Sequence, residues 1–119
     1  MHEVKAQLEE IQGFIRQGLK KVDLPAKRKE LEKLNSEISS EGFWNDKRNA
    51  AEVSQRAANL NRLIETWEGI KSECDELTSL LPEIHPEKDP KAAEDFKGMV
   101  AKLAERWRVL QISTFLGGK

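Results

Sequence analysis

Length, composition and charge already exclude several classes of protein. The chain has 119 residues, of which 38% are hydrophobic and 34% are charged, a balance typical of long helices with solvated faces. Twenty Lys and Arg stand against 21 Asp and Glu, and this net charge of -1 excludes the strongly basic surface of a dedicated nucleic-acid binder. A chain of this length favours one compact unit over two independent cores.

The N-terminal segment and the single cysteine bear on the cellular compartment. The sequence starts with MHEVKAQLEE, which lacks the apolar stretch of a signal peptide, and no run approaches about 18 apolar residues. Cys74 has no second cysteine with which to form an internal disulfide. We therefore expect a protein of the reducing cytoplasm that is neither secreted by this route nor spans a membrane.

Two amphipathic helices are predicted in the first 40 residues. The first extends over about residues 3–21, because its apolar residues step by four, three, four and four: Val4, Leu8, Ile11, Ile15 and Leu19. Asp23 followed by Pro25 is typical of an N-cap and a first-turn proline. The second helix is therefore expected from this point to about Ser39.

The strongest pattern predicts one long helix over about residues 46–81. It carries a heptad seam, in which one apolar series repeats every seven residues and a second fills the position three further on: Val53, Leu60, Trp67, Cys74 and Leu81, with Leu63, Ile70 and Leu77. Such a helix is about 54 Å long, too long for one short partner to cover. Three prolines in residues 82–90 then predict a non-helical loop.

A fourth helix is predicted after this loop. Asp89 and Pro90 repeat the cap-then-proline start, and the apolar residues again have helical spacing: Phe96, Val100, Leu103, Trp107 and Leu110. Residues 112–116, ISTFL, are β-branched and aromatic enough to begin a strand. The predicted fold class is all-α: an antiparallel helical bundle built on a long helical hairpin with two shorter N-terminal helices.

The residues most capable of chemistry form no catalytic or metal-binding constellation. His2 and His85 have no second histidine or cysteine at metal-ligand spacing, so solvated histidines are the simpler interpretation. Cys74 shares its heptad position with Trp67, which predicts a packed thiol rather than a nucleophile. Trp67 and Trp107 fall on apolar stripes and are expected in the core. We therefore predict no catalytic residue, no cofactor and no metal site.

Two short basic runs leave local contact with RNA open. Residues 27–29 read KRK, and residues 47–48 read KR directly after an aromatic pair, where such groups could meet a phosphate backbone. Glutamates interleave with the first run, and helical Lys and Glu three or four residues apart usually just solvate one another.

The stretch EGFWND, which contains Phe43 and Trp44, marks the corner between the second helix and the long third helix. Gly42 can take the turn, and Asn45 or Asp46 can cap the new helix. An apolar side chain before the cap can fold back onto the first helical turns. A binding patch is the alternative, but aromatic residues more often serve in packing, so we predict a structural corner.

Residues 23–55, DLPAKRKELEKLNSEISSEGFWNDKRNAAEVSQ, resemble the N-terminal region of bacterial peptide chain release factor 2, a family of class I release factors. The likeness extends through the long helix and the proline loop to RVLQISTFLGGK. The FWND corner is its most specific element, because the sister factor that reads a different set of stop codons lacks this tryptophan. The resemblance implies an N-terminal helical domain over residues 1–112, with residues 113–119 starting the junction to a missing codon-reading and catalytic region.

The resemblance implies a role in translation termination. Full-length members read the stop codons UGA and UAA and promote peptidyl-tRNA hydrolysis through a Gly-Gly-Gln loop, whereas the tail Gly117-Gly118-Lys119 lacks the glutamine. The family's helical domain lies towards the ribosomal stalk base, contacts ribosomal protein and RNA, and affects the recycling GTPase. This implies a fragment that is a ribosome-interaction domain and not an enzyme, with no individual contact residue assigned.

A free-standing coiled-coil adaptor is the alternative that the heptad pattern leaves open. It would dimerise through the seam of residues 53–81. A seam filled by the fourth helix of the same chain predicts instead a monomer near 13.6 kDa. The heptads alone do not separate the two, and we expect the monomer.

Overall fold

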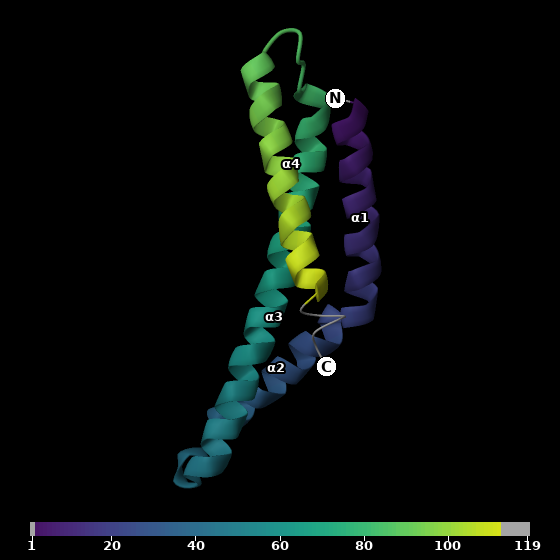
Figure 1. Cartoon of the computed structure of the whole chain (residues 1–119). Coiled ribbons are helices and arrows are strands. Elements are labelled where there is room, and N and C mark those ends of the chain that lie inside the picture. Colours follow the sequence, from purple (N-terminus) through teal and green to yellow (C-terminus); the bar gives the residue numbers. More distant parts are fainter. Residues whose placement is uncertain (1, 113–119) are drawn as a thin grey trace. The chain divides into compact units, whose positions relative to one another are not determined.

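The computed structural model describes residues 2–112, which form four α-helices joined by short turns, without a strand (Figure 1). The helices are α1 (His2–Val22), α2 (Leu24–Ile38), α3 (Lys47–Leu80) and α4 (Pro90–Gln111), with short 3-10 helices η1 (Phe43–Asn45) and η2 (Leu81–Glu83). The all-α prediction is confirmed, and the helix boundaries agree closely with those expected. The predicted junction and most of the strand-like segment, residues 113–119, lie outside the described residues.

Two aspartates start helices in the way that the sequence predicts. The Ala26 N–H donates to Asp23 Oδ1 at 3.2 Å, and the Ala92 N–H donates to Asp89 Oδ1 at 3.1 Å. Each bond satisfies a backbone amide that has no partner within the first helical turn. Asp23 adopts a φ of 58°, a left-handed conformation that aspartate tolerates better than most residues. This single residue therefore separates α1 from α2.

The described residues group into two compact units, whereas chain length alone favours one. Unit 2 is Leu19–Glu68, and the described part of unit 1 comprises residues 2–18 and 69–112. α3 contributes its first part to unit 2 and its last part to unit 1. A 34-residue helix carries more apolar stripe than one set of short partners covers, so the residues of α3 are shared between the two units.

In unit 1, the end of α3 and α4 are antiparallel neighbours. Arg106 on α4 is ion-paired with Glu73 on α3, while Met99 on α4 lines the same groove as Leu80 on α3. Residue numbers therefore fall along one helix as they rise along the other. This arrangement confirms the predicted return of the fourth helix along the third.

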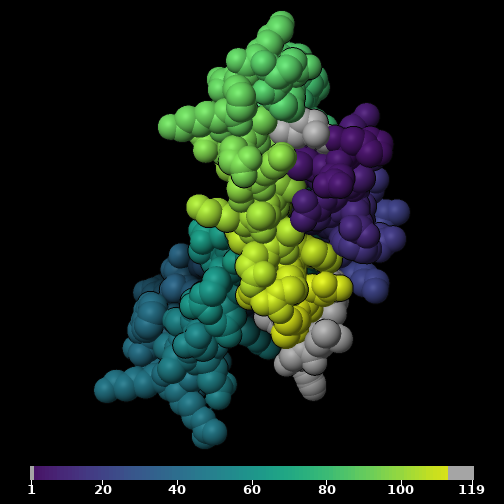
Figure 2. All heavy atoms as spheres, turned by 45° about the horizontal axis from the view of Figure 1, so that its top comes forward, coloured from purple at the N-terminus to yellow at the C-terminus, as the bar shows by residue number. Residues whose placement is uncertain are grey.

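The first part of α1 completes unit 1 as a three-helix bundle. Phe14 stacks on Trp107 of α4, with ring centroids 6.3 Å apart and an interplanar angle of 10°. Figure 2 shows side chains of α1, in purple, lying against those of α4, in green to yellow. The buried apolar residues of the unit come from all three helices: Val4, Leu8, Ile11, Ile15, Ile70, Cys74, Leu77, Ala93, Phe96, Val100, Leu103, Trp107 and Leu110.

Unit 2 is a helical hairpin of α2 and the first part of α3. Arg28 on α2 donates from Nε to Glu68 Oε2 on α3 at 3.0 Å, far from the turn. Near the turn, buried side chains of α2, η1 and α3 form one cluster: Leu34, Phe43, Ala50, Val53 and Ala57. The turn and the distant ion pair together show that these two helices are antiparallel.

The heptad seam of α3 is covered by side chains of the same chain. Trp67 is fully buried. The seam residues Val53, Ile70, Cys74 and Leu77 are also buried, while Leu60 and Leu63 are half-buried. A dimer that used this seam would have to displace those contacts. Within residues 2–112, no helix is both long and apolar enough to cross a membrane.

The cap of α4 gives a direct test of these local interactions. Asp89→Ala removes the acceptor of the Ala92 N–H and should lower the free energy of unfolding by about 1 kcal/mol, measured by urea denaturation followed by circular dichroism. Asp89→Asn keeps a capping oxygen and is the matched control. Equal losses for the two variants would contradict the assigned cap.

Candidate functional site

The corner between α2 and α3 is held by backbone hydrogen bonds and one glycine. The Phe43 N–H donates to Ser40 O at 3.3 Å, and Gly42 has a φ of 80°, a conformation that favours glycine. α3 begins at Lys47, directly after Asp46, whose Oδ1 accepts the Asn49 N–H at 3.1 Å. Of the two cap candidates in the sequence, Asp46 is therefore the one used.

The two adjacent aromatic residues of the corner have opposite environments. Phe43 is 8% exposed and belongs to the buried cluster of unit 2, whereas Trp44 is 60% exposed. Their rings meet edge to face, with centroids 5.0 Å apart and an interplanar angle of 87°. The predicted structural corner is confirmed for Phe43, but Trp44 lies mainly on the surface. Neighbouring side chains of a tight 3-10 turn point in different directions, so only one of them faces the core.

Two exposed cations follow Trp44 by three and four residues. Lys47 and Arg48 begin α3, and Arg48 Nε lies 3.8 Å from Glu52 Oε2. Such a pair between exposed side chains adds little stability, so its guanidinium is available to a partner. Tryptophan and arginine are the residue types most enriched at interaction hot spots. We call Trp44, Lys47 and Arg48 the hairpin tip, and it is the candidate contact surface.

The first basic run, residues 27–29, serves partly within unit 2. Arg28 donates from Nε and Nη2 to Glu68 of α3, and Lys27 is half-buried. This run is therefore less available to an outside phosphate than Lys47 and Arg48 are. Of the two runs that the sequence offered for RNA contact, the structure favours the second.

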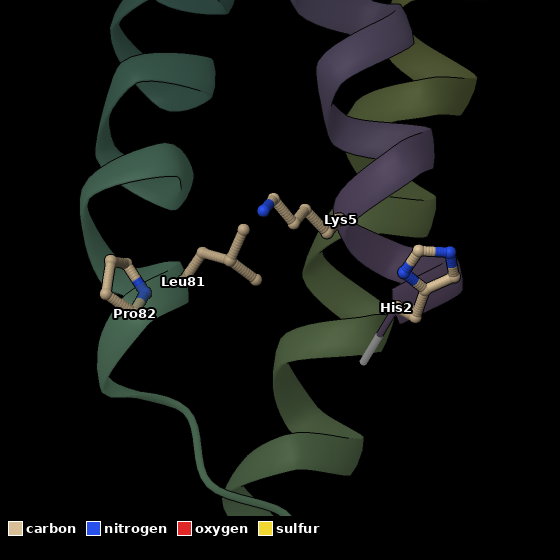
Figure 3. A pocket seen from close by; sticks show the side chains of 4 residues that line it. All are labelled: His2, Lys5, Leu81 and Pro82. Atoms are coloured by element: carbon tan, nitrogen blue, oxygen red, sulfur yellow. The ribbon is translucent and has the colours of Figure 1, made fainter.

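A hollow of about 350 Å³ lies between the first turn of α1 and the start of η2. Figure 3 shows its lining residues, with Lys5 and Leu81 pointing toward one another across the space and His2 and Pro82 at its sides. These four residues include neither a carboxylate nor a thiol with which the histidine or the lysine could act.

His85 and Cys74 occupy the environments that the sequence predicts. His85 is exposed in the loop, where its carbonyl accepts the N–H groups of Lys88 and Asp89. Burial raises the pKa of the Cys74 thiol, and the neighbouring Asp75 carboxylate raises it further. A raised pKa keeps the thiol protonated and unreactive. Across residues 2–112, no three or more His, Cys, Asp or Glu side chains gather to hold a metal ion.

Sequence comparison identifies the family. Residues 27–119 match the family model of the PCRF domain. The chain belongs to the PCRF domain family. Its similarity to proteins named peptide chain release factor 2 confirms the resemblance seen in the sequence.

Three of these relatives come from different bacteria. The protein from Chlamydia pneumoniae is 30% identical over 97 residues, which cover 82% of this chain and 26% of the relative. Those from Clostridium perfringens and Thermosipho africanus are 27% and 28% identical over 119 and 117 residues, which cover 100% and 98% of this chain and 30% and 31% of the relatives. The chain therefore spans less than a third of the length of the relatives it matches.

The opposite environments of the corner aromatics predict opposite effects of mutation. Phe43→Ala should lower the free energy of unfolding by about 3–5 kcal/mol because it leaves a cavity in the buried cluster. Trp44→Ala, at the adjacent and exposed position, should change it by less than about 1 kcal/mol. Urea denaturation of both variants is the measurement. A loss for Trp44→Ala as large as that for Phe43→Ala would contradict the exposed indole.

The raised pKa of Cys74 predicts a loss of stability in alkali. Above about pH 8.5 the thiol ionises in the unfolded chain but stays protonated when folded, so the stability it contributes at lower pH is lost as pH rises through the folded pKa. The slope is at most about 1.4 kcal/mol per pH unit. The chain contains no tyrosine to titrate in this range.

Denaturation of wild type and Cys74→Ala between pH 7 and 10 isolates this contribution, because the variant retains every other titrating group. The difference between the two free energies of unfolding should change with pH in the stated direction. A constant difference would show that the thiol titrates alike in the folded and unfolded states.

Proposed function

We propose that this chain acts in translation termination, as the ribosome-contacting helical domain of a release factor. The observation that carries the proposal is the PCRF domain match over residues 27–119, supported by relatives named peptide chain release factor 2. Because the chain spans less than a third of those relatives, the activity of a whole factor is proposed for the full-length protein only.

This proposal assigns different roles to different parts of the full-length protein. Residues 1–112 are the helical domain, and residues 113–119 start the junction to the part that reads UGA and UAA and promotes peptidyl-tRNA hydrolysis through a Gly-Gly-Gln loop. The chain by itself is then not an enzyme. Its partners are the ribosome near the stalk base, through ribosomal RNA and protein, and the recycling GTPase. The cytoplasm is the compartment in which bacterial ribosomes work.

The hairpin tip is the surface that we assign to the ribosome contact. Trp44 presents a large apolar face on a turn that Gly42 and the Asp46 cap hold in shape, so little order has to be gained on binding. Lys47 and Arg48, three and four residues further along the chain, are exposed cations, which suit the negatively charged surface of a ribosome. An exposed tryptophan followed by two cations can stack on an unpaired base or enter a pocket of a ribosomal protein.

The coiled-coil adaptor has less support than this function. Trp67, Ile70, Cys74 and Leu77, the centre of the seam it would use, are buried within a single chain. A monomer is therefore the oligomeric state that we propose.

The test is co-sedimentation of the 119-residue chain with purified bacterial ribosomes through a sucrose cushion. Wild type should pellet with the ribosomes, and Trp44→Ala should require about tenfold more ribosomes for the same bound fraction. Val109→Ala, which truncates an exposed side chain of α4 in unit 1 and leaves every residue of the tip unchanged, is the matched control and should bind like wild type. The bound chain should release no peptide from stalled ribosomes.

The possible failures separate the function from the assigned surface. Absence of wild-type binding, or release of peptide by the chain alone, would contradict the proposed role of the domain. Equal binding of wild type and Trp44→Ala would leave the ribosome as partner but remove the hairpin tip from the contact.

A further inference from the structure

Unit 1 contains a groove of about 420 Å³ between α3 and α4 that the proposed function does not use. One side is a stripe of α3 whose residues share one helix face, because each has another member three or four positions away: Gly69, Ser72, Glu73, Glu76, Leu77 and Leu80. The other side is contributed by Met99 of α4. The groove is therefore built on two rigid helices of one bundle.

The floor of the groove is apolar and partly open to solvent. Leu77 is buried beneath it, whereas Leu80 and Met99 are 37% and 41% exposed. Leu80 and Met99 therefore present apolar surface to solvent at the same hollow. Methionine adapts its shape to different partners and is over-represented at binding surfaces. The floor suits one or a few apolar side chains from outside.

The rim of the groove carries unbalanced negative charge. The Glu73 carboxylate is ion-paired with Arg106, whose guanidinium lies across Gly69; a Cβ at this glycine would stand 3.4 Å from Arg106 Nη2. Glu76 is exposed and makes no ion pair within residues 2–112. A cation brought in by a ligand would therefore find its counter-charge at Glu76.

We propose that this groove binds an amphipathic helix of a partner protein, which inserts an apolar side chain between Leu80 and Met99 and places a Lys or Arg against Glu76. An apolar strip between two helices is the surface on which helices dock, with anchors three or four residues apart. Because Glu76 is negatively charged, the partner helix should carry a positive charge next to its apolar anchor. This site is distinct from the hairpin tip, which belongs to unit 2.

The groove fits a helix better than it fits a small molecule. Pockets for drug-sized ligands enclose most of the ligand surface and present several convergent polar groups. Here both apolar anchors, Leu80 and Met99, remain partly in water, and Arg106 is already held by Glu73. A long, continuous apolar face can cover such an open strip, whereas a compact ligand would leave much of itself in solvent.

Two synthetic peptides of about 18 residues test the proposal with the 119-residue chain. Both carry leucines at helical spacing; the first has lysines beside the leucines, and the second has glutamates at the same positions. The lysine peptide should bind at least tenfold more tightly than the glutamate peptide in a fluorescence anisotropy titration. Binding should shift the methyl NMR signals of Met99 and Leu80, while that of Val109 should stay in place.

Substitutions at exposed positions test whether the peptides bind in the groove. Met99→Glu should weaken binding of the lysine peptide by at least tenfold, and Glu76→Lys should reverse the preference between the two peptides. Val109→Glu introduces the same charge on α4 at a 53% exposed position outside the groove and should bind like wild type. Circular dichroism establishes that each variant is folded, and ribosome binding of Met99→Glu should be unchanged.

Several outcomes would overturn the inference. They are equal binding of the two peptides, no binding of either at millimolar concentration, and equal weakening by Met99→Glu and Val109→Glu. Light scattering tests whether the groove binds a second copy of this chain instead. A wild-type dimer that Met99→Glu converts to a monomer would show that it does. None of these results bears on ribosome binding, so they remain distinguishable from failure of the proposed function.

Discussion

The structure depends on covering the apolar stripe of α3. This helix extends over 34 residues, and its seam continues from Val53 to Leu77 in both units. A surface of that length in water would be costly, since each large side chain gains about 1.5–3 kcal/mol on burial. In unit 2 the cover comes from α2 and η1, and in unit 1 the bundle is completed by α1 and α4. Each remaining element therefore has its place because it buries part of one helix.

Closing the hairpin of unit 2 separates two neighbouring aromatic residues. Phe43 enters the cluster that joins α2 to α3, and the same tight turn directs Trp44 into solvent. The interactions that stabilise the corner therefore also fix the position of the exposed indole. A contact surface formed in this way loses little conformational freedom on binding, because Gly42 and the Asp46 cap already determine the backbone. Stability and recognition are linked at this one turn.

The surface of unit 1 shows how helix packing creates features outside the core. The Arg106 side chain passes next to Gly69 and is ion-paired with Glu73, which balances two charges on the face shared by α3 and α4. Further along, Leu80 and Met99 are not fully covered by either helix, and Glu76 stays unpaired within residues 2–112. The sequence placed Leu77 on the seam, but Leu80 and Met99 had no assigned role. Neither residue occupies a position of the heptad seam. The groove is therefore visible only once α3 and α4 are seen to lie next to each other.

The sequence by itself determined the helices, their caps and the family, because apolar spacing, the Asp-Pro starts and the proline loop act over a few residues. It also placed Cys74, Trp67 and Trp107 in the interior. Tertiary structure alone decided that the chain groups into two units and that Trp44 is exposed beside a buried Phe43. The direction of a side chain in a tight turn, and the partners that cover a long helix, depend on contacts between residues far apart in sequence. Local periodicity does not contain that information.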